Sequence, residues 1–265
     1  MNKLSGEIVI VTGGAGMLGN QYCQAIREIN GFPVSLDIKY EKTVAFKEDI
    51  LEICCDISSE SQVMLALQHV KENLPDKPIY GLINNACIDP KFEKDSPNSP
   101  NSRLECYPSD FFDWEIAVGL KGAFLCTKHF GAEMASNGRG SIINISSVLG
   151  LVAPNQALYK KEGVSENEQP CKPVTYSIIK HGIIGLSKYT ATYWAHRGIR
   201  CNTLAPGGVY NNHCNEFVEK LLKYIPLAKM AEKSSYNEAI KFLLTDASSY
   251  MTGAVLQMDG GQSTW

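Results

Sequence analysis

The sequence lacks the features that would mark a membrane protein, a nucleic-acid-binding protein or a secreted protein. No apolar run reaches the roughly 18 residues that a membrane-spanning helix needs. The 25 Lys and Arg residues against 28 Asp and Glu residues leave no basic excess for nucleic acid. The start of the chain, MNKLSGEIVIVTGG, has no room for the apolar region and cleavage site of a signal peptide. We therefore expect a cytoplasmic protein that binds neither membrane nor nucleic acid.

Cysteine is not scarce, but the spacings that would give it a structural role are missing. The nine cysteines are odd in number, and no two of them have CxxC spacing. This pattern suits free thiols in a reducing cytosol better than a disulfide framework or a zinc site. The five histidines are scattered as well, so we predict no metal centre.

Strand-like and helical segments alternate along nearly the whole chain. Several of the strand-like runs, such as IVIV and GSIINI, are continuously apolar, as expected when both faces of a sheet are covered. This alternation predicts one α/β domain over residues 1–265, with a doubly wound parallel sheet of Rossmann type and about seven strands. The strands are expected at Glu7–Thr12, Pro33–Asp37, Leu51–Cys55, Ile79–Asn84, Ser141–Ile145, Ile199–Leu204 and Val255–Met258, and the helices at Met17–Asn30, Ser59–Asn73, Pro108–Asn137, Pro173–Arg197 and Ser235–Asp246.

Long polar segments interrupt this alternation. Ile88–Tyr107 contains DSPNSPNS, and Ala153–Lys172 is polar and bounded by prolines. Both follow strands at their carboxyl ends, where open α/β sheets bind ligands. We expect the cofactor half to span roughly residues 1–145, and residues 88–107, 153–175 and 207–233 to shape the substrate site. Disorder is the alternative for the first loop.

The segment IVIVTGGAGMLG (8–19) is an apolar strand that runs into a glycine-rich turn and then a helix. Gly13 permits the tight turn, Gly16 lets the backbone approach a pyrophosphate, and Gly19 lets helix and strand pack together. Met17 and Leu18 then belong to the helix N-terminus, whose N–H groups attract phosphate oxygens. The alternative is an ordinary glycine-rich turn, but the position after the first strand favours a dinucleotide site.

Two carboxylates end the next strands. Asp37 lies 21 residues after Gly16, where a carboxylate accepts hydrogen bonds from the adenosine ribose and repels a 2′-phosphate. Asp37 therefore predicts NAD as the cofactor over NADP, although the nearby Lys39 could weaken that repulsion. Asp56 is placed to meet the adenine, and its alternative role is to cap the helix that starts near Ser59.

Tyr176 and Lys180 are four residues apart on the predicted helix 173–197, so they share a helix face. A lysine ammonium beside a phenol favours the phenolate and lowers a pKa that is otherwise about 10. Such a phenol can exchange a proton near neutral pH. Ser147 ends the strand of NISS, where its hydroxyl can bind a substrate oxygen. A chance Tyr and Lys on a solvated helix is the alternative for these two residues alone.

Taken together, these motifs resemble the short-chain dehydrogenase/reductase family over essentially the whole chain. The matching pieces are TGGAGMLG (12–19), Asp37, Asp56–Ile57, NNAC (84–87), NISS (144–147), YSIIK (176–180), NTLAPGGV (202–209) and TGAVLQMDGG (252–261). The resemblance implies Ser147, Tyr176 and Lys180 as catalytic residues, with Tyr176 and Lys180 also at the nicotinamide ribose. It implies a homotetramer or dimer, and further cofactor contacts from Ile57, Asn85, Ala86, Cys87, Pro206, Gly207 and Val209.

The chain departs from the family pattern at three points. Met17 stands where compact members have glycine, and Gly119 stands where the family has a helical asparagine that helps hold a water of the proton relay. Tyr176 lies 29 positions after Ser147, more than twice the usual spacing. Tyr159 lies closer, but Gly163 four residues later provides no lysine partner. We therefore keep Tyr176 and interpret residues 159–175 as an insertion beside the substrate.

The insertion, the PGGVYNN turn (206–212) and the DGGQSTW ending are most similar to short-chain dehydrogenases of bacterial surface-sugar pathways, including flagellin modification. The sequence thus predicts an NAD-dependent oxidoreductase that interconverts a secondary alcohol and a ketone on a polar sugar-derived or nucleotide-sugar substrate in carbohydrate biosynthesis. The alternatives are a reductase of ketoacyl or small-ketone type and a weakly active dinucleotide-binding sensor.

Overall fold

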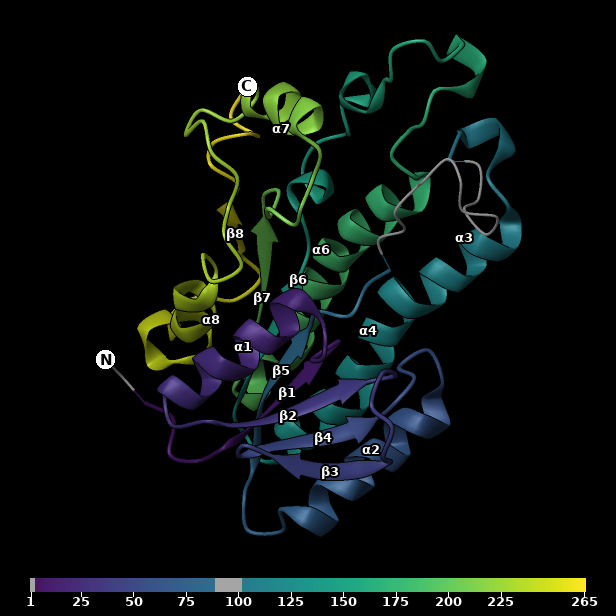
Figure 1. The fold of residues 1–265 in the computed structure, drawn as a ribbon. Helices are drawn as coiled ribbons and strands as arrows, with labels where there is room; N and C mark the ends of the chain where they lie inside the picture. Colours follow the sequence, from purple (N-terminus) through teal and green to yellow (C-terminus); the bar gives the residue numbers. More distant parts are fainter. Residues whose placement is uncertain (1–2, 89–101) are drawn as a thin grey trace.

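The computed structural model describes residues 3–88 and 102–265, and an eight-stranded sheet forms its centre (Figure 1). The strand order is β3-β4-β2-β1-β5-β6-β7-β8, and every neighbouring pair is parallel except β3 with β4. The predicted α/β class with a doubly wound sheet is confirmed. The strands are β1 (Ile8–Thr12), β2 (Phe32–Asp37), β3 (Val44–Lys47), β4 (Ile50–Cys54), β5 (Ile79–Asn84), β6 (Gly140–Ile145), β7 (Ile199–Pro206) and β8 (Val255–Met258).

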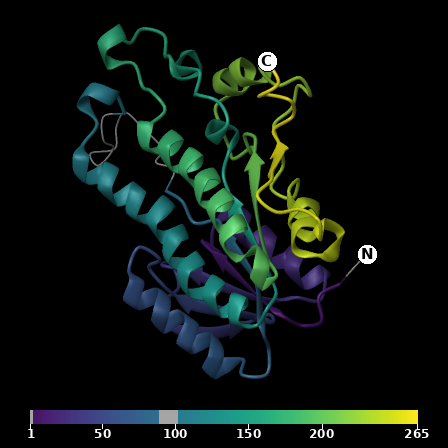
Figure 2. The same ribbon diagram turned by 180° about the vertical axis from the view of Figure 1, so that it is seen from behind.

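Helices cover both faces of the sheet, as the views from front and back show (Figures 1 and 2). On one face α1 (Met17–Glu28) and α8 (Asn237–Leu244) pack against each other and against the strands, with Tyr22 and Ile240 fully buried. The other face is covered by α2 (Glu60–Asn73), by the long helix that contains Phe130, and by α6 (Val174–Trp194). This double cover explains why β1, β5 and β6 are buried along their whole length.

One long helix runs from residue 109 to 136, close to the predicted bounds. It consists of α3 (Ser109–Ile116), α4 (Gly122–Cys126) and α5 (Ala132–Ser136), joined by wider π-type turns at 117–121 and 127–131. The helix α6 continues as a 3₁₀ turn over Ala195–Arg197 and ends at Gly198, whose φ of 71° is left-handed. A glycine takes that conformation without steric cost, so Gly198 is the predicted stop of this helix.

The structure adds two elements that were not predicted. β3 pairs antiparallel with β4 at the edge of the sheet, and α7 (Asn215–Leu222) lies inside the segment 207–233 that was interpreted as a loop. Most of the other predicted loop, residues 89–101 of 88–107, lies outside the described residues. None of the helices in the described residues is long and apolar enough to cross a bilayer.

The sheet topology fixes where a ligand can bind. From β1 the chain moves first toward β2 and β4 and later returns on the other side of β1 to β5, β6 and β7. Such a change of direction leaves a crevice at the carboxyl ends of the central strands. The glycine-rich turn, Asp37, Asn85 and Ser147 all stand at this edge of the sheet.

Candidate active site

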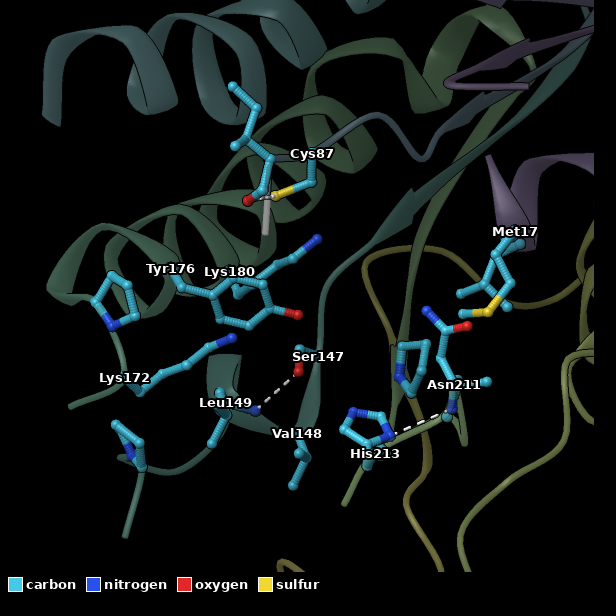
Figure 3. A pocket seen from close by; sticks show the side chains of 18 of the residues that line it. Met17, Cys87, Ser147, Val148, Leu149, Lys172, Tyr176, Lys180, Asn211 and His213 are labelled. Atoms are coloured by element: carbon cyan, nitrogen blue, oxygen red, sulfur yellow. Dashed lines mark hydrogen bonds between the residues drawn. The ribbon is translucent and has the colours of Figure 1, made fainter. Parts of the chain in front are cut away.

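A cavity of about 1400 Å³ occupies the crevice at the carboxyl ends of the strands. At one end it is lined by the turn after β1 and by Asp37, and at the other by the insertion and α7. Tyr176, Lys180 and Ser147 lie on its wall between these ends, as Figure 3 shows from close by. The volume exceeds that of usual small-molecule pockets, so it can hold a dinucleotide together with a substrate.

The turn after β1 is shaped by its glycines. Gly13 has a φ of 66°, and a Cβ there would lie 2.9 Å from the Cα of Ala86. A Cβ on Gly19 would lie only 2.2 Å from the carbonyl oxygen of Gly13. Gly16 is the N-cap of α1 and brings no side-chain cap, so the first N–H groups of the helix face the cavity beside Met17 and Leu18.

Thr12 and Asn85 brace this turn from the neighbouring strand end. The Thr12 hydroxyl accepts hydrogen bonds from the backbone N–H groups of Asn85 (3.0 Å) and Ala86 (3.1 Å). The Asn85 side chain donates to the carbonyl oxygens of Thr12 (3.0 Å) and Gly13 (3.3 Å). Asn85, Ala86 and Cys87 line the cavity as predicted, and the structure assigns the Asn85 amide to the turn itself.

The two carboxylates at the strand ends differ in their surroundings. Asp37 is buried and accepts hydrogen bonds from the backbone N–H groups of Ala15 (3.1 Å) and Lys39 (3.0 Å), which fix its position at the cavity wall. Asp56 accepts from both the N–H (2.9 Å) and the hydroxyl (2.7 Å) of Ser58, just before α2. The N-cap of α2 is Ser59 and no side chain caps this helix, so the alternative capping role of Asp56 is wrong, and both Asp56 and Ile57 line the cavity.

Tyr176 and Lys180 lie side by side in the first two turns of α6. The Lys180 Nζ is 5.6 Å from the centroid of the Tyr176 ring and donates to the carbonyl oxygen of Ile145 at 3.0 Å. Lys180 is only 5 % exposed, so its ammonium is held in one place. Ser147 follows β6, and its hydroxyl oxygen accepts from the N–H of Leu149 at 3.2 Å. The three side chains converge on one part of the cavity (Figure 3).

Residue 119 is a glycine because α6 packs closely against it. A Cβ on Gly119 would lie 2.9 Å from Cγ2 of Ile179, the neighbour of Lys180. An asparagine at this position would need Ile179 to move. The backbone of the wider helical turn 117–121 therefore approaches α6 at Ile179, and residue 119 brings no side chain there.

Tyr159 occupies a different environment from Tyr176. Its ring packs against Phe217 of α7 with centroids 5.8 Å apart, whereas Lys180 lies over the Tyr176 ring. Both tyrosines line the cavity. Tyr176 is the tyrosine whose ring lies beside Lys180.

The segment after β7 closes the cavity beside these residues. Pro206 ends β7, and a Cβ on Gly207 would lie 2.7 Å from the Cα of Asp259 in the chain after β8. Val209 pairs with Ala231 through an isolated bridge. Pro206, Gly207 and Val209 all line the cavity, in the place where the sequence predicted cofactor contacts.

The insertion at residues 159–175 is held together from inside by Gln169. This side chain is 8 % exposed. Its amide nitrogen donates to the carbonyl oxygens of Lys161 (3.0 Å) and Val164 (2.7 Å), and its oxygen accepts from the N–H of Lys161 (2.8 Å). Arg103, from the segment before α3, donates to the carbonyl oxygen of Glu166 at 2.8 Å. The insertion is thus a defined wall of the cavity.

Several residues near the site were not predicted. Ser146 is buried and donates to the carbonyl oxygen of Lys180 at 2.7 Å. Thr175 donates to the buried Glu115 carboxylate at 2.5 Å, which also accepts from the Tyr107 hydroxyl at 2.6 Å. Burial and this carboxylate raise the pKa of Tyr107 to about 12, so the phenol stays a donor at neutral pH. These contacts tie the first turn of α6 to α3, and no local sequence signal marks them.

Comparison with known proteins supports the whole-chain resemblance. The family described as enoyl-(acyl carrier protein) reductase matches residues 39–263. The chain is 28 % identical to the post-translational flagellin modification protein A of Campylobacter coli, covering 97 % of this chain and 98 % of that protein. It is 27 % identical to the NADH-dependent L-xylulose reductase of Ambrosiozyma monospora, over 99 % and 97 % of the two chains.

A solved structure has the same fold. The gluconate 5-dehydrogenase from Burkholderia cenocepacia, in complex with NADP and tartrate, superposes with a TM-score of 0.84 at 23 % identity, covering 99 % of this chain and 97 % of the other. The relatives and the solved structure match at least 97 % of this chain, so the similarity concerns the whole domain.

Proposed function

Because the chain belongs to the short-chain dehydrogenase/reductase family and is an oxidoreductase of CH–OH groups, we propose that it is NAD-dependent. Its reaction interconverts a secondary alcohol and a ketone on a polar, sugar-derived or nucleotide-sugar substrate. The observation that carries this proposal is one cavity in which Ser147, Tyr176 and Lys180 converge beside a polar insertion. The names of an L-xylulose reductase and a galactitol 2-dehydrogenase among the relatives support a sugar-like substrate.

The residues at the other end of the cavity fit a nicotinamide dinucleotide, which the family binds. Gly13 and Gly16 line the cavity and carry no side chain that could stand between the backbone of the turn and a pyrophosphate. The uncapped N-terminus of α1 has no acidic residue in its first turn, so its N–H groups can donate hydrogen bonds to phosphate oxygens. Asn85, Ala86 and Cys87 would lie along the adenosine side, and Pro206, Gly207 and Val209 beside the nicotinamide.

Asp37 supports NAD over NADP. Its carboxylate is buried at the cavity wall and oriented by two backbone N–H groups, which leaves its remaining lone pairs for ribose hydroxyls. A 2′-phosphate would bring a second negative charge against it. The side chain of Lys39 is exposed, and the residue contacts Asp37 through its backbone N–H.

In the proposed reaction, Tyr176 exchanges the proton of the alcohol. The ammonium of Lys180, fixed by the Ile145 carbonyl, stands beside the Tyr176 ring and favours the phenolate. Ser147 accepts from Leu149 through its oxygen, so its hydroxyl proton can point to the substrate oxygen and hold it near the phenol. The nicotinamide supplies the hydride chemistry.

The assembly is also part of the proposal. Large aromatic side chains of the helices on one face of the sheet are strongly exposed: Trp114 (50 %), Phe124 (49 %), Tyr189 (66 %) and Tyr193 (56 %). Exposed aromatic residues of this size support a homo-oligomer, a tetramer or dimer. Light scattering on the purified protein tests this, and a monomeric mass at micromolar concentration would contradict it.

The decisive experiment measures NADH formation on a panel of polyols, hexoses, sugar acids and nucleotide sugars, and NADH consumption on short apolar ketones, with Tyr176→Phe as the control. We expect turnover with at least one polar substrate, and loss of that turnover in the variant while NAD still binds. Turnover restricted to short apolar ketones would favour the small-ketone reductase. Binding of NAD without any turnover across alcohols and ketones would favour the sensor.

A further inference from the structure

The cavity contains a second lysine at Tyr176 that the proposed proton transfer does not use. The Nζ of Lys172 lies 4.0 Å from the centroid of the Tyr176 ring, closer than the Nζ of Lys180. Figure 3 shows the Lys172 side chain reaching into the cavity below this ring, toward Ser147. A cation over a phenol ring is stabilised by the negative face of the ring. Lys172 therefore presents a positive charge beside the position where the substrate oxygen would lie.

The backbone around Lys172 is fixed, although lysine is a flexible residue. The N–H of Lys172 donates to Oε1 of Gln156 at 2.8 Å, and the N–H of Cys171 donates to the hydroxyl of the buried Ser102 at 2.9 Å. The buried Pro173 follows and caps α6. These contacts come from two separate segments of the chain, so the direction in which Lys172 leaves the backbone is set by the fold.

The charges around this end of the cavity favour an anion. Lys160, Lys161 and Lys220 also line the cavity, against the carboxylates of Glu162 and Glu216. Lys220 is paired with Glu216 at 2.6 Å. The buried Glu115 carboxylate lies behind the first turn of α6 and already accepts two hydrogen bonds. The adenosine end carries the carboxylates of Asp37 and Asp56 beside a single lysine, Lys39.

We propose that Lys172 binds an anionic group of the substrate, a carboxylate or a phosphate, attached close to the carbon that exchanges the hydride. The inference rests on the proposed function, since it places the substrate oxygen between Tyr176 and Ser147. A substituent on a neighbouring carbon then reaches the Lys172 ammonium. A hydrogen bond between two charged groups is shorter and stronger than one to a neutral hydroxyl, so Lys172 discriminates between acidic and neutral sugars.

The test measures binding by calorimetry to the protein saturated with NAD, so that the probes cannot occupy the phosphate site of the cofactor. D-Gluconate is compared with D-glucitol for the carboxylate, and sn-glycerol 3-phosphate with glycerol for the phosphate. The unmutated protein should bind at least one anion more tightly than its neutral counterpart. Lys172→Gln should weaken that binding about tenfold to hundredfold and leave the neutral compound unchanged.

Two further variants control the result. Lys172→Arg should retain most of the preference for the anion, and Lys233→Gln, which removes the same charge from an exposed position outside the cavity, should behave as the unmutated protein. NAD affinity and melting temperature of Lys172→Gln should stay unchanged, which shows that the variant folds. If gluconate is the probe whose binding depends on Lys172, the anionic group is a carboxylate, and if it is glycerol 3-phosphate, the group is a phosphate.

The inference would be overturned if the unmutated protein bound the charged and neutral probes equally or bound neither anion. It would also be overturned if Lys172→Gln weakened the binding of an anion and of its neutral counterpart by the same factor. The readout is independent of turnover. Tyr176-dependent oxidation of neutral polyols without any preference for an anion would leave the proposed function standing and reject the role of Lys172. Anion binding through Lys172 with no turnover of any alcohol would support the role of Lys172 in binding and reject the proposed function.

Discussion

The two ends of the cavity are built in opposite ways. The end near β1 is made of backbone and small residues, and its glycines are packed so closely that a Cβ would collide with neighbouring atoms. The end near α7 is made of side chains: polar ones on an insertion that includes Lys172 and is braced by Gln169, and apolar ones such as Phe217. Backbone geometry serves a ligand shared by a whole family, whereas side chains on loops can change with the substrate. A substitution at one end should therefore spare the other, and a substitution between them should affect the reaction itself.

The largest effect is expected where the two ends meet. Tyr176→Phe removes the proton-exchanging hydroxyl and should lower kcat by about 10²- to 10⁴-fold, with NAD affinity retained. Tyr159→Phe removes the hydroxyl of the tyrosine that packs against Phe217 and should leave kcat nearly unchanged. Steady-state kinetics beside NAD titration separates the two. If Tyr176→Phe stayed active and Tyr159→Phe were inactive, Tyr159 and not Tyr176 would be the proton-exchanging residue.

A matched pair of glycines contrasts the two ends directly. Gly13 and Gly163 have similar left-handed φ values of 66° and 72°, but a Cβ on Gly13 would collide with Ala86 while one on Gly163 meets nothing within 4 Å. Gly163→Ala should cost only the backbone strain, about 1 kcal/mol. Gly13→Ala should add the collision and weaken NAD binding by about a hundredfold. Thermal melts and NAD titration check both, and equal NAD affinities in the two variants would contradict the contrast.

Asp37→Ala should weaken NAD binding by about tenfold to hundredfold, because a charged acceptor for the ribose hydroxyls is lost. NADP binding should change less, so the preference for NAD narrows. The substrate KM at saturating NAD should stay constant. Fluorescence titration with both dinucleotides measures the ratio, and equal affinity of the unmutated protein for NAD and NADP would refute the role of Asp37.

The smallest change concerns the insertion. Gln169→Ala removes three hydrogen bonds from inside it and should raise the substrate KM severalfold without changing NAD affinity. Hydrogen exchange should become faster over residues 160–168. Asn167→Ala, an exposed residue of the same segment, is the control and should show neither effect. Loss of NAD binding in Gln169→Ala would mean that the insertion clamps the cofactor.

The sequence predicted those parts of the fold that depend on local patterns. Continuous apolar runs marked the central strands, and Gly198 marked the end of α6. The edge strand β3 was missed because its hairpin turn uses Glu48 and Asp49, both with positive φ (49° and 64°), where glycine or asparagine is the usual signal. The helix α7 was hidden in a polar segment whose apolar residues form a small cluster with Leu158 and Tyr159, apart from the main core.

The candidate site also has parts that local sequence patterns indicate and parts that they do not. The glycine turn, Asp37 and the YSIIK segment are contiguous motifs, so the sequence indicated them. The sequence could not indicate Lys172, because the position of its side chain depends on contacts with distant parts of the chain. Its own N–H bonds to Gln156, 16 residues away, and the N–H of Cys171 bonds to Ser102, 69 residues away. Its role comes from the path of a loop, and loop paths are set by such distant contacts.

The hydrogen bonds of Gln169 bear on the thermodynamics of substrate binding. A loop that becomes ordered only around its ligand loses conformational entropy at that moment, and the affinity is reduced accordingly. In this protein the side chain of Gln169 already joins Lys161 and Val164, so much of that entropy is lost when the chain folds. Substrate association should therefore show a small entropic penalty, and removing Gln169 should transfer the ordering cost from folding to binding.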